Sequence, residues 1–420
     1  MTKARIYRSL GGTPGKAMRV LLDLVRSDGL LKVSGDVVVL IKPNLQWFNQ
    51  GAPNIAATKA LIDFIFDRPG FDGEVVLAEN NHLGPRPWEK GGWANRFVRN
   101  SGLEGIANYN ELAKVLKAQY GNRFSICHWM DLDKGGRRVC RPPDGPGYVI
   151  CDGTGGVEWI CVDNGLAGNG HRQTVMTYPI FTTDLGTLVD LRHGVWTGRH
   201  YDNGRLQWIN LAALNHHSLY CGATSAVKNI FGVVDLSGGA DPQTNGKIVG
   251  QYYNFHAFAF DSWLMGPRLG AMGLAVGTFL SRIRRPDLNI TTAYWIGLCS
   301  RTALPVAHTK VLLASTDPVA LDYYSTKYIL YPNSRIQVHN PDRASGPLYH
   351  DLRTCAQVAG YVVGDQDIDV ISVDVDTRVT DGNGKGPVKG KIHWGLRPRA
   401  LAKYLVFRTS MQSRLGRLVK

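Results

Sequence analysis

The sequence lacks the features that assign a chain to several familiar classes. It contains no run of eighteen apolar residues, so we expect no membrane-spanning helix. No apolar segment follows the basic N-terminus, so we expect no secretory signal and, by default, a cytoplasmic protein. Neither a phosphate-binding loop nor a glycine-rich dinucleotide turn occurs between a predicted strand and helix, so no nucleotide-binding fingerprint is present.

The seven cysteines do not have the spacing of a metal site. No two form a Cys-x-x-Cys pair, and the first four, between Cys127 and Cys161, are thirteen, eleven and ten residues apart. Zinc and iron–sulfur sites use tighter spacings. The sequence therefore has no iron–sulfur motif, and we expect buried free thiols. It identifies no cofactor.

Acidic residues are absent from the C-terminal end. Lys385–Lys420 has ten Lys/Arg and no Asp or Glu, and so accounts for ten of the fourteen net positive charges. Residues 400–420 place most of their apolar side chains on one side of a predicted helix. Such a basic amphipathic helix can lie on an anionic membrane surface or pack on the body of the protein. Charge alone supports no nucleic-acid partner, and we expect none.

Repeated strand–helix units indicate the fold class. Residues 36–41 and 73–78 are continuous apolar runs typical of buried parallel strands, and residues 54–66 between them have helical periodicity. Successive units of this kind predict an α/β fold with a mostly parallel, doubly wound sheet.

Polar residues directly follow both of these predicted strands. Lys42 and Asn44 follow the first strand, and Glu79 follows the second. In open α/β sheets, ligands bind beyond the carboxyl ends of the strands, so these side chains are candidates for a site. The alternative is an ordinary polar turn or a network whose members satisfy one another.

The remaining sequence suggests a division into four parts. Residues 120–210 are rich in Gly, Pro and Asp and predict an irregular or β-rich insertion, whereas residues 1–119 and 211–380 predict the two halves of the α/β core, and 381–420 is the basic tail. We also expect a lead-in segment at 1–35 and a loop at 192–210. Helices are expected at 93–119, 254–265, 268–284 and 348–359. Strands are expected at 174–179, 186–191, 288–295, 309–314 and 368–375.

The stretch from His216 to Gly232 concentrates residue types that perform chemistry. His216 and His217 precede a helical pattern, and Lys228 and Asn229 lie on its last turn beside the buried face. We expect this cluster to form part of a pocket wall.

A second helix start is predicted at Asp317. Thr316 or Asp317 can cap a helix with Pro318 in its first turn, and Asp322 lies one turn further on.

These pieces together resemble a family of uncharacterised proteins, domain of unknown function 362 (DUF362). The resemblance rests on Ile41–Asn44, Glu79, residues 216–232 and residues 314–322, and it covers roughly residues 35–330 in the same order. It implies an α/β fold but no particular reaction. Some members carry an appended ferredoxin module, which this chain lacks. The acidic, glycine-rich segment that many members place before the second helix reads Ile296–Arg301 here.

The sequence favours an enzyme that performs acid/base chemistry on an anionic small molecule. Redox and isomerase-type reactions are among the reaction classes that this hypothesis leaves open. Imidazole titrates near neutral pH, and a desolvated lysine can act as a base or nucleophile. The candidate catalytic residues are His216, His217, Lys228, Glu79 and Asp322, and the candidate substrate-binding residues are Lys42, Asn44, Asn229, His256 and Asp317.

Two alternatives remain from the sequence. One is a metal-binding protein that uses His216, His217, His256 or His308 with an acid. Adjacent histidines on a strand point in different directions, so the pair is a poor chelate and we assign no metal ligand. The other is a non-catalytic binding protein with a membrane-surface tail.

Overall fold

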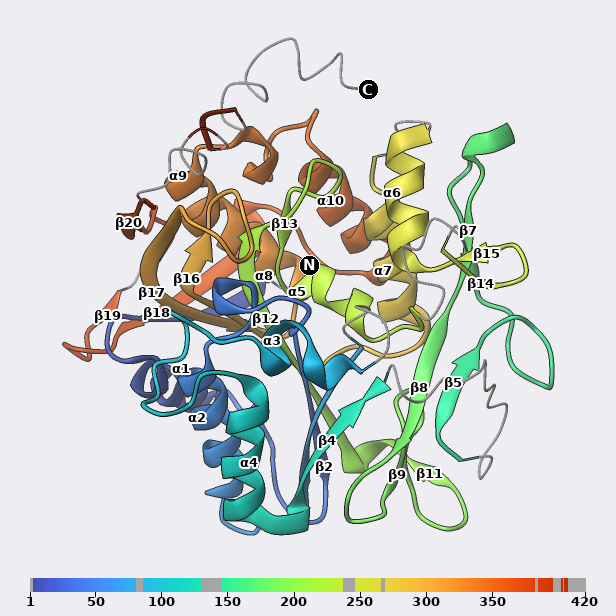
Figure 1. Cartoon of the computed structure of the whole chain (residues 1–420), viewed down its shortest axis with the longest axis horizontal. Coiled ribbons are helices and arrows are strands. Elements are labelled where there is room, and N and C mark those ends of the chain that lie inside the picture. Colours follow the sequence, from blue (N-terminus) through green and yellow to red (C-terminus); the bar gives the residue numbers. More distant parts are fainter. Residues whose placement is uncertain are drawn as a thin grey trace.

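The structure is a computed structural model of the whole chain, shown in Figure 1. It describes residues 3–80, 86–129, 145–236, 246–265, 269–381, 384–395, 402 and 404–406.

The central element is a mixed, mostly parallel sheet with the strand order β19-β18-β1-β17-β16-β12-β2-β3-β4. The five adjacent strands β16, β12, β2, β3 and β4 run parallel to one another, and β1 runs parallel to β18. Strand β17 is antiparallel to both of its neighbours in this order, β1 and β16. The predicted α/β class is therefore confirmed. The strands are β1 (Ala4–Leu10), β2 (Val38–Pro43), β3 (Glu74–Glu79), β4 (Phe124–His128), β12 (Leu206–His216), β16 (Leu288–Gly297), β17 (Val306–Ser315), β18 (Ile368–Asp374) and β19 (Thr380–Asp381), with β13 (Ala223–Thr224) on β12 and β20 (Lys391–His393) on β17.

Apolar cores cover both faces of this sheet, which is why apolar residues occupy both faces of strands such as β2 and β3. On β2, Val39 and Ile41 join one core, and Val38 and Leu40 join the other. The first core also contains residues of α1 (Pro14–Ser27), α2 (Ile55–Phe66) and α4 (Tyr109–Tyr120). The second contains residues of α5 (Ala226–Asn229), α6 (Phe255–Met265), α7 (Ala271–Arg282), α8 (Pro318–Ser325) and α10 (Pro347–Ala359). The short helices α3 (Gly91–Ala94) and α9 (Tyr331–Ser334) complete the described set.

Antiparallel sheets occupy much of the region predicted to be β-rich. A five-stranded sheet in the order β11-β10-β9-β8-β5 lies to the right in Figure 1. Its strands are β5 (Gly147–Ile150), β8 (Thr177–Thr182), β9 (Leu188–Asp190), β10 (Gly194–Trp196) and β11 (Tyr201–Asp202). Two hairpin-like pairs accompany it, β6 (Cys161–Asp163) with β7 (Gln173–Val175) and β14 (Lys247–Val249) with β15 (Tyr252–Tyr253).

Strands contradict two of the sequence-based expectations, and the loop expected at 192–210 already contains β10 and β11. The lead-in expected at 1–35 contains β1, a sheet strand whose Arg8 is buried and donates to Ser372 and Tyr324. The loop expected at 192–210 ends in β12, which lies between β2 and β16 and is buried along almost all of its length. In β1 and β12 polar residues interrupt the apolar pattern, and some of them bond to distant partners, as Arg8 does to Ser372 and Asn210 to Asn289.

Helix prediction failed mainly between residues 93 and 119. This range holds the end of α3 and most of α4 but no continuous helix, because Asn108 caps α4 through its side chain and starts a new helix there. The helices expected at 54–66, 254–265, 268–284 and 348–359 correspond to α2, α6, α7 and α10 within a few residues. The strands expected at 36–41, 73–78, 186–191, 288–295, 309–314 and 368–375 correspond to β2, β3, β9, β16, β17 and β18, whereas the single strand expected at 174–179 is divided between β7 and β8. In the described part of the chain, no helix combines the length and apolar character needed to cross a membrane.

Candidate functional site

The direction of strand addition reverses between β2 and β12. From β2 the chain adds β3 and then β4 on one side, and from β12 it adds β16 on the other. The two strands are parallel neighbours, with Leu211 paired to Pro43. The connections that leave their carboxyl ends diverge at such a point, so a crevice forms there and commonly binds ligands.

A polar pocket lies at this reversal. Counted together with the open solvent at its mouth, it has a volume of about 370 Å³. Its lining residues are Lys42, Asn44, Gln46, Trp47, Glu79, Asn80, His217, Thr224, Lys228, Asn229, Phe231, Gly232, Leu236, His256 and Arg301. The structure therefore brings together Lys42, Asn44, Glu79, His217, Lys228, Asn229 and His256 from the predicted set.

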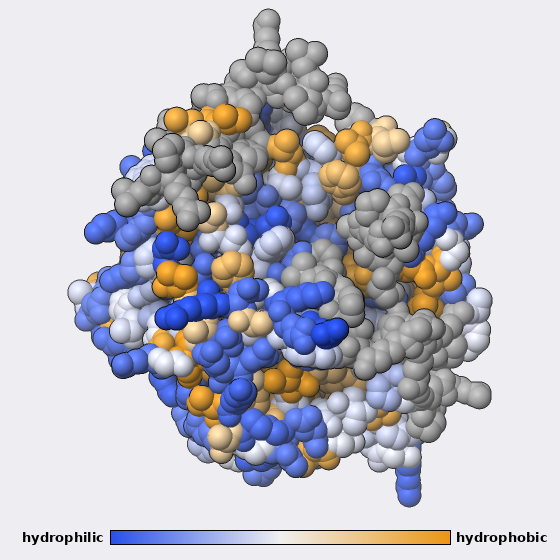
Figure 2. All heavy atoms as spheres, viewed as in Figure 1, coloured by the Kyte–Doolittle hydropathy of each residue, from blue (hydrophilic) through white to orange (hydrophobic). Residues whose placement is uncertain are grey.

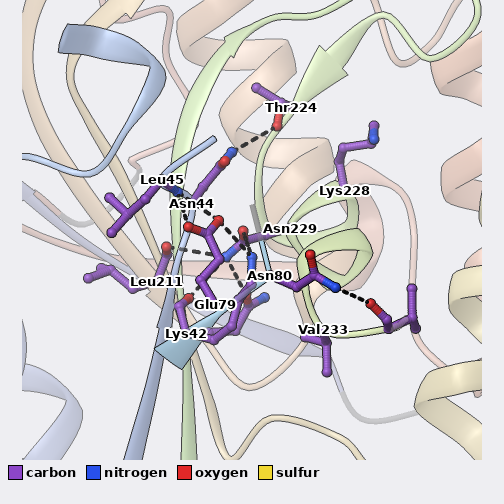
Figure 3. A network of polar contacts seen from close by, with 12 residues as sticks. Lys42, Asn44, Leu45, Glu79, Asn80, Leu211, Thr224, Lys228, Asn229 and Val233 are labelled. Carbon is purple, nitrogen blue, oxygen red and sulfur yellow. Dashed lines mark hydrogen bonds and ion pairs between the residues drawn. The ribbon is translucent and has the colours of Figure 1, made fainter. Parts of the chain in front are cut away.

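Lys42 and Glu79 form a buried pair in the pocket wall (Figure 3). Their side chains are 1% and 2% exposed, and Lys42 Nζ lies 3.5 Å from Glu79 Oε1. The backbone N–H of Leu45 also donates to the Glu79 carboxylate, at 2.7 and 2.8 Å from its two oxygens. Burial lowers the pKa of Lys42 to about 8 and raises that of Glu79 to about 7, while their mutual attraction opposes both shifts.

Asn229 joins the two strands that flank the reversal. Its Oδ1 accepts a 2.6 Å hydrogen bond from Lys42 Nζ, and its amide nitrogen lies 3.1 Å from the Lys42 carbonyl and 3.2 Å from the Leu211 carbonyl. The same nitrogen lies 2.8 Å from Asn210 Oδ1. Asn229 is thus fully used by the protein, and its role is to hold β2, β12 and α5 together.

Gly232 leaves the space that the lysine occupies. A Cβ at this position would lie 2.4 Å from Lys42 Nζ and 3.1 Å from the Asn80 carbonyl oxygen. Real Cβ atoms do not approach that closely, and Lys42 is held from the other side by Asn229. The glycine that ends the predicted helical stretch is therefore required by close packing.

Lys228 differs from Lys42 because no carboxylate in the described part of the chain lies within ion-pair distance of it. Its Nζ lies 3.2 Å from His256 Nε2 and 3.5 Å from the centre of the Phe231 ring. Figure 3 shows its side chain turned away from the Lys42–Glu79 pair. Burial lowers its pKa to about 7, and the charges of Arg301 and Lys42 act in the same direction.

The family comparison concerns the segment that carries Lys228. The model described as Domain of unknown function (DUF362) matches residues 207–327. The matched residues are similar to this family, and we refer to them below as the DUF362 domain. The resemblance predicted from the sequence is confirmed for these residues, whereas residues 35–206 lie outside the match. No curated protein and no solved structure matches the chain.

The DUF362 domain provides only part of the pocket. It contributes Thr224, Lys228, His256 and Arg301, whereas Lys42 and Glu79 lie on strands that precede the matched segment. The pocket therefore depends on packing of the DUF362 domain against the N-terminal β2–β3 unit.

Two acidic residues of the DUF362 domain that were predicted site residues lie outside the pocket lining. Asp322 accepts the N–H groups of Ala226 and Val227 at 2.8 and 2.9 Å and so holds the start of α5. Asp317 caps α8 through Val319 and Ala320 and also accepts from Val362. Burial raises the pKa of Asp322 to about 7 and that of Asp317 to about 6. Both residues support helices in this structure.

The two adjacent histidines point to different places. His217 lines the pocket, and its Nδ1 lies 2.9 Å from the Cys221 sulfur. His216 does not line the pocket, and its Nδ1 lies 2.9 Å from His339 Nε2. His216 is the last residue of β12 and His217 follows the strand, and their side chains have separate partners.

Arg301 and Trp47 are pocket residues that the sequence did not predict. The Arg301 guanidinium lies 4.5 Å from the centre of the Trp47 ring, and both residues line the pocket. Arg301 follows β16, a neighbour of β12, so the strand-end rule applied to the predicted strand at 288–295 could have found it. It stands in the segment where the sequence departs from the family pattern.

The structure does not bring the proposed metal ligands together. His308 stacks on Trp295 at 4.0 Å between ring centres, while His216 contacts His339 and His256 contacts Lys228. Within the described residues, no group of three His, Cys, Asp or Glu could hold a metal ion. The cysteines seen there are free thiols, five of them buried and Cys161 partly so, as expected, and Cys140 lies outside the described residues.

Proposed function

We propose that this chain is an enzyme that binds an anionic small molecule in the pocket and performs acid/base chemistry on it. The charge of the lining carries the proposal. Among the described lining residues, Lys42 and Arg301 are cationic, Lys228 is cationic in its protonated form, and Glu79 is the one carboxylate. Glu79 is already bound by Lys42 and by the Leu45 N–H, so the lining attracts an anion.

Lys228 is the proposed base. With a pKa of about 7, a large fraction of its amine is unprotonated at neutral pH and can accept a proton from the substrate. His256, 3.2 Å away, can exchange that proton with Lys228. Lys42 and Arg301 then stabilise the negative charge on the substrate.

Polar groups at the mouth can orient the ligand. Asn44 lies beside Thr224, with 3.4 Å between the amide nitrogen and the hydroxyl oxygen, and both line the pocket. This bond is long, so both groups can turn toward a ligand at small cost. Asn229 does not contact the substrate in this proposal, because its amide is fully engaged in hydrogen bonds within the protein.

Calorimetric titration tests the anion site. Inorganic phosphate, malonate and the cation choline are titrated into the wild type and into Lys228→Gln, Arg301→Gln and Lys310→Gln. Lys310 is the matched control, because it is exposed on β17 and absent from the pocket lining. We expect the two anions but not choline to bind, with at least a tenfold loss for each pocket variant and no change for the control. Equal affinity in all four proteins would contradict the proposal.

We also infer a cytoplasmic location, because the described cysteines are free and cytosolic thiols stay reduced.

The basic tail has a separate test. Tyr404 is buried and donates to the Ser334 carbonyl at 2.8 Å, so this residue of the predicted amphipathic helix packs on the body. Residues 407–420 lie outside the described residues, and their membrane role remains a prediction. Equal pelleting with anionic vesicles, with and without residues 397–420, would contradict it.

A further inference from the structure

One face of α6 is apolar and exposed. Phe260 and Leu264, four residues apart on this face, are 41% and 48% exposed. Orange spheres gather over the upper end of this helix in Figure 2. Exposed apolar side chains that lie next to one another mark an interaction site more often than single, scattered apolar side chains do.

The exposed face begins inside the pocket. His256, which lines the pocket, is followed at helical spacing by Phe260, Trp263 and Leu264. Positions i, i+4, i+7 and i+8 share one face of a helix. The same face of α6 therefore presents an imidazole to the pocket at its first turn and apolar groups to solvent two turns later.

Aromatic rings connect these two ends through Tyr220. The Tyr220 ring centre lies 5.6 Å from that of His217, a pocket residue, and 5.5 Å from that of Phe260. Trp263 follows at 6.4 Å from Tyr220 and 6.1 Å from Phe260. A ligand that leaves the pocket along these rings stays in contact with apolar surface.

We propose that the ligand is an amphiphilic anion, whose charged head binds in the pocket and whose hydrocarbon chain lies along the exposed face of α6. This inference depends on the proposed function, since the head requires the Lys228 and Arg301 charges. The two halves of the site match the two halves of such a molecule. The cationic lining suits a phosphate or carboxylate, and the Phe260–Leu264 face suits an alkyl chain.

Chain length is the variable that tests this proposal. Each fully buried methylene contributes about 0.8 kcal/mol, or about a fourfold change in Kd. Methyl, butyl and octyl phosphate, each below its micellar concentration, are titrated calorimetrically into the full chain, and acetate, pentanoate and nonanoate form a parallel series. Because the α6 face is partly open, we expect octyl phosphate or nonanoate to bind at least ~100-fold more tightly than the shortest member of its series.

Substitutions separate the chain site from the head site. Phe260→Ser and Leu264→Ser should each reduce the gain from methyl to octyl by at least tenfold and leave methyl phosphate binding unchanged. Leu185→Ser is the matched control, because Leu185 is 55% exposed and is not a pocket residue. It should leave the whole series unchanged. Lys228→Gln should weaken every member of the series.

Four results would overturn the proposal. If short and long members bind equally, the anion pocket stands and the chain site does not exist. If octyl phosphate binds while methyl phosphate does not, and Lys228→Gln has no effect, the α6 face binds chains without the pocket. If no member of either series binds, the proposed function fails as well. If Leu264→Ser changes the oligomeric state or the pelleting with phosphatidylglycerol vesicles but not the chain-length gain, the face serves a second copy or a membrane.

Discussion

Lys42 and Asn229 exchange two hydrogen bonds across 187 positions of the chain. The lysine ammonium donates to the Asn229 side-chain oxygen at 2.6 Å, and the Asn229 amide donates to the Lys42 carbonyl at 3.1 Å. This pair fixes the end of β2 against the α5 segment that carries Lys228. The position of the proposed base is therefore tied to the sheet.

Asn229→Ala should be strongly destabilising. It leaves the buried Lys42 ammonium with Glu79 at 3.5 Å and removes the donor to the Lys42 and Leu211 carbonyls. We expect a loss of about 2–4 kcal/mol in the free energy of unfolding, measured by urea titration. Asn95→Ala is the control, because Asn95 is exposed and its side chain donates one bond, to the Gly91 carbonyl. A loss no larger than that of the control would show that the Lys42–Asn229 pair contributes little.

Gly232→Ala should disturb the pocket through Lys42. The new methyl would lie 2.4 Å from the Lys42 nitrogen, so the lysine must leave its place between Asn229 and Glu79. We expect a stability loss of about 1–3 kcal/mol and at least a tenfold weaker phosphate affinity.

Gly386→Ala is the matched control for this substitution. Gly386 is exposed, and a Cβ there would meet no atom within 4 Å. Both stability and phosphate affinity should remain as in the wild type. If Gly232→Ala behaves like this control in calorimetry and urea unfolding, the close approach to Lys42 has no functional consequence.

Asp322→Asn distinguishes a supporting residue from a catalytic one. The carboxylate accepts from two backbone N–H groups, whereas an amide has one acceptor oxygen and presents its NH₂ to the other donor. We expect a loss of about 1–3 kcal/mol in unfolding free energy together with weaker phosphate binding, because α5 carries Lys228. Asp342→Asn, which alters a partly exposed ion pair with Lys327, should cost less than about 1 kcal/mol. Unchanged stability with lost turnover would make Asp322 catalytic.

Lys228→Met should change how stability depends on pH. The folded-state pKa of Lys228 is about 7, below the usual lysine pKa of 10.5, so between these two pH values the unfolded chain binds more protons than the folded one. The contribution of Lys228 to the free energy of unfolding is therefore lowest at and below pH 7 and rises toward pH 10.5. The variant should be more stable than the wild type at pH 7, by up to a few kcal/mol, and the gap should narrow at higher pH.

Urea unfolding of both proteins at pH 7, 8 and 9 measures this gap. Other titrating groups are common to the two proteins and cancel in the difference. A gap that stays constant with pH would show that Lys228 titrates alike in the folded and unfolded chains. The desolvation on which its role as a base depends would then be absent.

Local chemistry determined much of this fold. The apolar runs ending at Ile41 and Ala78 are strands, because continuous apolar stretches need a sheet that is covered on both faces. The cap at Asp317 starts α8, as its neighbours Pro318 and Val319 predict. Lys42 and Glu79 meet at one edge because parallel strands end on the same side of a sheet.

Only the tertiary structure decided the remaining features, because they depend on contacts between distant segments. β12 is a central strand although Asn210 and Asn215 interrupt its apolar pattern, since both amides find partners more than fifteen residues away. Asp322 became the support of α5, and His216 turned to His339, because strand register and helix packing set those directions. Local sequence specifies which residues are polar at strand ends, but it does not specify which of them share a pocket.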